Sequence, residues 1–168
     1  AVKKVVAELM DQFSVKSFGY ECDITKEKNI IKVCKSIISK VGRIDGLINN
    51  AANNPKMDKI NSSNRLENFS LQKWNDDFNV GVTGAFLCSR IFGNEMVKRK
   101  SGVIINISSD LGLIAPDQRL YHKKDIHENK QDVKPVSYSV TKHAIIGLTK
   151  YLATYWASNG VRANALCP

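Results

Sequence analysis

The chain has 168 residues, 43% of them hydrophobic, which is enough for one domain with its own core and implies no second domain. It shows no secretory leader and no apolar run near the roughly 18 residues of a membrane span, so we expect a cytoplasmic protein without membrane contact. The net charge of +9 is spread over lysines on amphipathic segments without an aromatic-interleaved basic cluster, which argues against nucleic-acid binding and favours a basic surface that attracts anionic substrates.

The first part of the chain alternates between helical and extended patterns. Apolar residues recur at helical spacing from Val2 to Phe13, and residues 15–22 are predicted to be a short strand. A second helix follows, with its apolar residues on one face, and Gly42 is placed to end it. The apolar positions of this helix are Ile30, Ile31, Cys34, Ile37, Ile38 and Val41.

Residues 44–49 form the next predicted strand, with the apolar pattern of a buried strand. Helices that alternate with short apolar strands indicate parallel β-α-β units, whose ligands bind beyond the carboxyl ends of the strands. Asn49-Asn50-Ala51-Ala52 occupies such an end. The small alanines would let a flat ring or a ribose approach the backbone closely, although a plain turn explains the same residues.

A long polar loop is predicted for residues 53–70, on the ligand side of the sheet. Ser70 is placed to cap a helix that runs from Leu71 to about Lys100. This helix carries Trp74, Phe78, Val82, Phe86 and Ile91 on its apolar positions. The segment from Gly102 to Ser108 is then β-branched and buried in pattern, as is typical of a parallel strand.

Residues 136–159 are predicted to form the last helix, closed by Gly160, with a strand over residues 161–166. Tyr138 and Lys142 lie one turn apart on this helix and therefore share a face. A free tyrosine has a pKa of about 10 and is a poor base, but a nearby lysine charge favours the phenolate and makes proton exchange with a hydroxyl or carbonyl feasible. Ser109 could hydrogen-bond the same substrate oxygen. Taken alone, the Tyr/Lys pair is more often an ordinary surface pair.

Four motifs in this order resemble the short-chain dehydrogenase/reductase family over the whole length of the chain: Asn49 to Ala52, Ile105 to Ser109, the Tyr138/Lys142 pair, and Gly160 to Pro168. The resemblance implies an α/β fold with a Rossmann-type doubly wound parallel sheet, and NAD or NADP as the cofactor. It implies catalytic roles for Ser109, Tyr138 and Lys142. The cofactor-binding residues that it implies are Asp23, Ile24, Asn49, Ala51, Ile107, Tyr138, Lys142 and Pro168. Taken by itself, the Asp23-x-Thr25 pattern before a helix also fits simple capping.

An insertion separates two of these motifs, because Tyr138 follows Ser109 by 29 positions, against about a dozen in the family pattern. Residues 115–135 should therefore loop out over the pocket and shape specificity, although each side chain could equally belong to a solvated loop. Such a polar lid suits a sugar, a sugar phosphate or a nucleotide sugar better than a steroid or a long acyl chain. Its polar residues include Asp117, Gln118, Arg119, Tyr121, His122, Lys123, Lys124 and His127.

No metal site is expected, because His122 and His127 lack carboxylates or cysteines at ligand spacing. The cysteines form no CxxC pair, and we interpret them as reduced core residues. One position departs from the family: the asparagine expected three residues before Gly84, which helps to hold a water in the proton relay, is replaced by Gly81. Asn79 should not substitute, since two residues along a helix turn it about 200° away.

These motifs predict an oxidoreductase that interconverts a secondary alcohol and a ketone. Its expected substrate is a polar small molecule that is sugar-like or anionic. The resemblance also implies a homodimer or homotetramer through the 71–100 and 136–159 helices, although packing within one subunit explains the apolar pattern nearly as well. Two alternatives stay open: a non-catalytic binding or scaffold protein with this fold, and a nicotinamide-dependent nucleotide-sugar epimerase or dehydratase.

The resemblance further predicts that residues 1–168 are one portion of a longer polypeptide. The family's glycine-rich strand-turn-helix would precede them and its substrate-covering segment would follow. Within the family, Ser108 to Arg119 is most similar to members associated with bacterial flagellin or surface-sugar modification.

Overall fold

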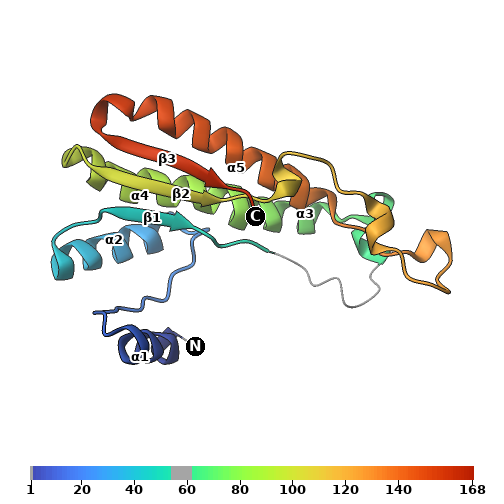
Figure 1. Ribbon diagram of the computed structural model, residues 1–168, viewed down its shortest axis with the longest axis horizontal. Helices are drawn as coiled ribbons and strands as arrows, with labels where there is room; N and C mark the ends of the chain where they lie inside the picture. The colour runs from blue at the N-terminus through green and yellow to red at the C-terminus, as the bar shows by residue number, and fades with distance from the viewer. Residues whose placement is uncertain (1, 54–61) are drawn as a thin grey trace.

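The computed structural model describes residues 2–53 and 62–168. Its centre is a parallel sheet in which β2 pairs with β1 on one side and with β3 on the other (Figure 1). The strands are β1 (Gly46–Asn49), β2 (Gly102–Ile107) and β3 (Val161–Leu166). Parallel neighbours connected through helices confirm the predicted α/β class.

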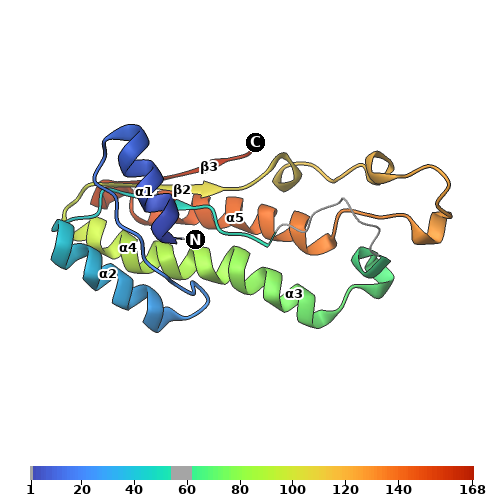
Figure 2. The same cartoon turned by 90° about the horizontal axis from the view of Figure 1, so that it is seen from below.

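Three helices cover one face of this sheet, namely α2, α4 and α5, and α3 continues α4 toward the insertion (Figures 1 and 2). Helix α1 stands apart from them and contributes no buried residue. The helices are α1 (Val2–Phe13), α2 (Glu27–Val41), α3 (Leu71–Phe78), α4 (Ala85–Lys98) and α5 (Val136–Tyr155). No helix within residues 2–53 and 62–168 has the length and apolarity needed to cross a bilayer.

The predicted strand over residues 15–22 is wrong, because this segment is irregular. A strand forms only where a neighbour pairs with its backbone N–H and C=O groups. The described sheet ends at β1, and none of its strands lies beside residues 15–22. The segment therefore has the composition of a strand but no neighbouring strand with which its backbone could pair. The loop predicted over residues 53–70 falls partly outside the described residues, and its later part contains two short 3-10 turns, Ser62–Asn64 and Leu66–Asn68.

The helix predicted from Leu71 to about Lys100 is interrupted. It begins as expected, with the Ser70 hydroxyl accepting a hydrogen bond from the Lys73 N–H at 3.2 Å. Residues 79–84 then form a π-helical segment between α3 and α4. Single π turns inside α-helices widen the backbone and are frequent at functional sites. Gly81 lies in this π-helical segment and faces Thr141 of α5.

Gly42 ends α2 in the left-handed conformation as predicted, and Gly160 is also left-handed but follows a 3-10 turn. Gly42 has φ 85° and follows α2, and Gly160 has φ 70°. The helix that precedes Gly160 is shorter than expected, because α5 ends at Tyr155 and residues 157–159 tighten into a 3-10 turn. Such tightening is common in last turns, where backbone carbonyls lack helical partners.

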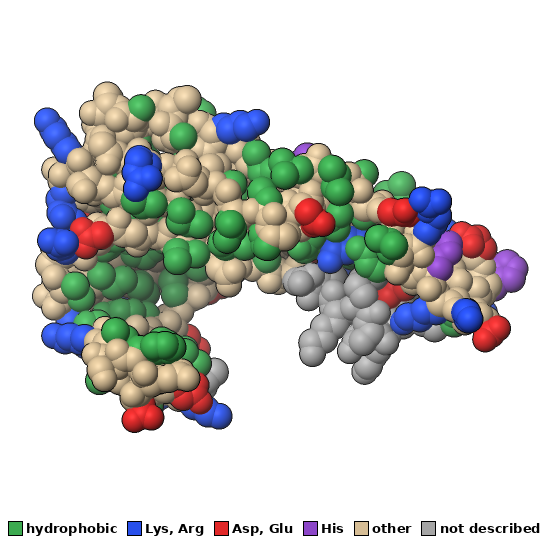
Figure 3. All heavy atoms as spheres, in the orientation of Figure 1, with side chains coloured by type: hydrophobic (Ala, Val, Ile, Leu, Met, Phe, Trp, Pro, Cys, Tyr) green, Lys and Arg blue, Asp and Glu red, His purple; other side chains and the backbone are tan. Residues whose placement is uncertain are grey.

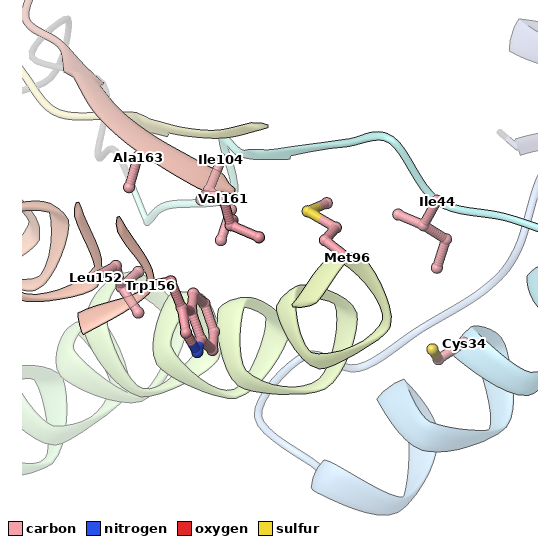
Figure 4. Packing of buried hydrophobic residues seen from close by; sticks show 8 residues of the cluster. All are labelled: Cys34, Ile44, Met96, Ile104, Leu152, Trp156, Val161 and Ala163. Carbon is pink, nitrogen blue, oxygen red and sulfur yellow. The ribbon is translucent and has the colours of Figure 1, made fainter. Parts of the chain in front are cut away.

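The main core lies between the sheet and helices α2, α4 and α5 (Figure 4). Its buried members are Cys34, Ile44, Met96, Ile104, Leu152, Trp156, Val161 and Ala163. The opposite sheet face is open in this chain, so Ile48 is 66% exposed, and the expectation of a buried strand is wrong for β1. Figure 3 shows hydrophobic side chains along the middle of this view of the molecule.

Gly160→Ala is expected to destabilise the fold by about 2–4 kcal/mol, from left-handed backbone strain and overpacking. A Cβ at this position would lie 2.2 Å from the Lys100 carbonyl oxygen, which is backbone and cannot rotate away. Urea unfolding followed by circular dichroism measures this cost. Gly81→Ala is the matched control, because its Cβ would meet Thr141 at an ordinary 3.6 Å. Equal stabilities for the two variants would contradict the prediction.

Candidate active site

The Tyr138/Lys142 pair lies where α5 crosses the carboxyl end of β2. Lys142 is only 7% exposed, and its Nζ donates a hydrogen bond to the Ile107 carbonyl oxygen at 2.8 Å. The same ammonium is 5.7 Å from the centroid of the Tyr138 ring. Burial lowers the pKa of Lys142, and the positive charge of Lys134 lowers it further. The structure therefore places a desolvated ammonium beside the phenol.

Ser109 stands at the end of the same strand and is buried. Its hydroxyl donates to Asp110 Oδ1 at 2.7 Å and accepts from the Leu111 N–H at 3.3 Å. The turn that carries it packs on α5, because the Ser108 hydroxyl donates to the Lys142 carbonyl oxygen at 2.8 Å. Ser109 and the Tyr/Lys pair thus lie at the same end of β2. In this conformation the Ser109 hydroxyl donates its hydrogen bond to Asp110.

A small hollow gathers four of the residues that the sequence assigned to cofactor binding. Asn49, Ala51, Ile107 and Lys142 line it together with Gly81. Its volume of about 10 Å³ is close to the minimum that one water molecule needs. Gly81 thus faces the ammonium end of the site.

Asn79, by contrast, is exposed, which agrees with the expectation that it does not take the place of the family's asparagine.

The other predicted cofactor residues lie around this hollow at different distances. Ile24 lines a neighbouring hollow of about 90 Å³ with Asn49 and Ala51. Asp23 is outside both hollows and accepts hydrogen bonds from the Thr25 hydroxyl at 2.7 Å and from its N–H at 2.9 Å. These two bonds, the hydroxyl first, hold the pKa of Asp23 below its ordinary value. They form a local turn before α2, whose N-cap is Lys26 without a side-chain cap hydrogen bond, so the capping interpretation of the Asp-x-Thr pattern is wrong. The Pro168 carbonyl accepts from the Asp110 N–H at 3.1 Å.

A buried amide network fixes the carboxyl ends of β1 and β2. The Asn49 side chain donates to Asn106 Oδ1 at 2.7 Å and to the Ser89 hydroxyl at 2.9 Å. Asn106 is fully buried and donates to the Thr149 hydroxyl on α5 at 2.8 Å. Satisfied buried amides of this kind fix the relative positions of the elements that they join. The network therefore holds the hollow and the Tyr/Lys helix in register.

The insertion has its own internal order. Gln131 is buried and binds three backbone groups, with its Nε2 donating to the carbonyls of Lys123 and Ile126 and its Oε1 accepting from the Lys123 N–H. Burial raises the pKa of Tyr121, and the charges of Asp110 and Tyr138 raise it further. Within the described ranges, no three His, Cys, Asp or Glu side chains cluster closely enough to hold a metal ion.

One site residue was missed in the sequence. Lys134 places its Nζ 3.8 Å from the centroid of the Tyr138 ring, closer than Lys142 does. Its position four residues before Tyr138 mirrors that of Lys142 four residues after it, so the spacing Lys-x-x-x-Tyr-x-x-x-Lys was the available signal. This spacing was not used because Pro135 marks the start of the helix, so Lys134 lies before the helix and outside its periodicity.

Family models match both parts of the chain. A model described as short chain dehydrogenase matches residues 1–121. A model described as enoyl-(acyl carrier protein) reductase matches residues 126–168. The short stretch between the two matches lies inside the insertion.

Similar proteins carry several names. The 3-oxoacyl-[acyl-carrier-protein] reductase FabG of Aquifex aeolicus is 32% identical over 99% of this chain. The D-threitol dehydrogenase of Mycolicibacterium smegmatis is 27% identical over 89% of it. The chain spans 58% of the first protein and 49% of the second, so it corresponds to about half of such a polypeptide.

Solved structures agree with the fold. A xylitol dehydrogenase bound to NAD+ superposes with a TM-score of 0.80 and 25% identity, over 99% of this chain and 55% of that protein. ElxO with NADP bound gives a TM-score of 0.74 and 30% identity, over 96% of this chain and 58% of that protein. These relatives have Rossmann-type sheets, so the fold predicted from the sequence is confirmed.

Proposed function

Because the chain belongs to the short-chain dehydrogenase family, we propose that the protein containing it is an NAD(P)-dependent oxidoreductase that interconverts a secondary alcohol and a ketone. The observation that carries this proposal is the placement of the Tyr138 phenol beside the buried Lys142 ammonium, at the carboxyl end of β2. A scaffold protein would have no use for a desolvated cation at that point, since its burial lowers the stability of the fold.

The roles follow from the chemistry of each group. Tyr138 would give a proton to a carbonyl oxygen or take one from a hydroxyl. Lys142 would stabilise the phenolate with its charge, and its hydrogen bond to the Ile107 carbonyl holds it in place. Ser109 would orient the substrate oxygen, once its hydroxyl turns from Asp110 toward the substrate.

The residue types around the hollow suit contacts with a nicotinamide cofactor, which would lie outside the hollow, since its volume of about 10 Å³ holds one water molecule at most. Small side chains at Ala51 and Gly81 leave the backbone accessible beside Lys142, which supplies hydrogen-bond donors for a ribose. When bound, NAD or NADP would supply the hydride acceptor or donor. Asn49, Ile107 and Lys142 would then line the ribose side, with Ile24 and Asp23 toward the adenine.

The proposed substrate is a polar small molecule that is sugar-like or anionic. The insertion supports this proposal, because it places the Lys134 ammonium 3.8 Å from the centroid of the Tyr138 ring. Relatives named for threitol and xylitol are consistent with a polyol, whereas those named FabG are 3-oxoacyl-[acyl-carrier-protein] reductases. All four cysteines are free thiols, which supports the cytoplasmic location that we propose.

A fluorescence titration of the full-length protein with NADH and NADPH tests the assignment. Saturable binding of one cofactor, followed by turnover in a panel of polyols and keto acids, is the expected result. Absence of binding by either cofactor would contradict it and favour the scaffold alternative. Product analysis separates the epimerase alternative, because an epimerase returns the cofactor to its starting redox state.

We also propose a homodimer or homotetramer through α3, α4 and α5. Exposed aromatic and apolar side chains on these helices support it: Leu71, Phe86, Val140, Tyr151 and Tyr155. Tyr151 is 60% exposed, and Tyr151→Asp is expected to shift the assembly to monomers, because a carboxylate buried in an apolar interface stays unpaired. Sedimentation velocity measures the change. Lys150→Asp, an exposed neighbour on another face of the helix, is the control, and loss of assembly in both variants would contradict a specific interface.

A further inference from the structure

The position of Lys134 is fixed by the insertion. The side-chain amide of Gln118 pairs with both backbone polar groups of Lys134: the Lys134 N–H donates to Gln118 Oε1 at 2.9 Å, and Gln118 Nε2 donates to the Lys134 carbonyl at 3.4 Å. Pro135 follows and is buried at the start of α5. The residue is thus clamped on both sides, and its side chain is directed over Tyr138.

Two ammonium groups lie near the phenol ring. Lys134 lies 3.8 Å and Lys142 5.7 Å from the Tyr138 ring centroid, and the two ammonium groups repel each other. Burial is the main cause that lowers the pKa of Lys134, and Asp110 acts in the opposite direction. The Asp110 carboxylate is shared with the Ser109 hydroxyl and the Leu111 N–H. An anion beside the ring would relieve this repulsion, since nearby opposite charge stabilises a half-buried cation.

The two lysines have different surroundings. Lys142 Nζ is directed at the Ile107 carbonyl and lies against the hollow beside Gly81. Lys134 comes from the end of the insertion, two residues before α5 begins. It also lies against a wider groove, which Gln118, Pro135 and Ser139 line as well.

We propose that Lys134 determines specificity by binding an anionic oxygen group, a carboxylate or a phosphate, that the substrate carries close to its reacting carbon. This inference rests on the proposed function, since it takes Tyr138 as the group that meets the reacting oxygen. An ammonium that stands over the face of that ring can reach an anionic group one or two carbons from the reacting carbon. The insertion thereby contributes a positively charged group that binds the substrate.

Two matched pairs of probes test the proposal with the full-length protein: acetoacetate with methyl acetoacetate, and dihydroxyacetone phosphate with dihydroxyacetone. Ligand-observed NMR titrations give their dissociation constants with and without NADP+, and need no turnover. We expect one anionic probe to bind more tightly than its neutral partner. In Lys134→Met this preference should fall roughly 10- to 100-fold, as expected for the loss of a charge-assisted hydrogen bond. The pair that responds distinguishes carboxylate from phosphate.

Three variants make the result decisive. Lys134→Arg should retain most of the preference, and Lys124→Met, which removes an exposed lysine of the same insertion, should leave it intact. An equal preference in wild type and Lys134→Met, or no preference in wild type, would overturn the proposal. Failure of NADH and NADPH to bind would instead count against the proposed function, and the probe titrations without cofactor would still test Lys134.

Discussion

Tyr138→Phe is expected to lower kcat by about 10²- to 10⁴-fold, the usual contribution of a positioned proton donor or acceptor. The phenylalanine ring keeps the surface on which the Lys134 ammonium lies, 3.8 Å from the ring centroid, so the fold should be unchanged. Cofactor affinity should be largely retained, because the Lys142 hydrogen bond to Ile107 does not depend on the phenol.

The measurement is steady-state turnover with the best alcohol from the polyol panel, alongside the NADH or NADPH titration. Tyr155→Phe is the control, since this tyrosine is 62% exposed at the far end of the same helix. Retained turnover in Tyr138→Phe would show that the proton moves through another group and would refute the assignment. A parallel loss of cofactor binding would indicate a structural role.

Lys142→Met is expected to lower kcat by a factor similar to that of Tyr138→Phe, while the free energy of unfolding stays nearly unchanged. The charge that favours the phenolate disappears, but so does a desolvated ammonium that Lys134 repels. Methionine fills similar space, and the Ile107 carbonyl loses one hydrogen bond, so these structural effects nearly cancel. Activity and stability should thus separate at this residue.

The pH dependence of stability tests the same point. The pKa of Lys142 is lower in the folded state than the ordinary 10.5, so the unfolded chain binds more protons in the alkaline range below that value. The free energy of unfolding should therefore rise as pH increases toward 10.5, and this rise should shrink in Lys142→Met. Urea unfolding at two alkaline pH values measures it, with exposed Lys150→Met as control. An unchanged slope in Lys142→Met would contradict burial of the charge.

The sequence by itself determined the features that depend on residues a few positions apart. The spacing of Tyr138 and Lys142 placed both on one helical face, and Ser70 and Gly42 marked helix ends where the structure has them. These are local effects, because a cap or a shared face needs only the neighbouring turn of backbone. The parallel α/β class also followed from the alternation of helices with short apolar strands.

Only the tertiary structure decided which distant groups meet. Residues 15–22 have the composition of a strand but no partner, and strand pairing depends on segments remote in the sequence. The donation from Ser109 to Asp110 and the position of Lys134 over Tyr138 depend on how the turn and the insertion fold back. Local sequence patterns determine which side chains share a face of one helix or strand. Packing and buried hydrogen bonds determine which elements meet, and they therefore decided which residues make up the site.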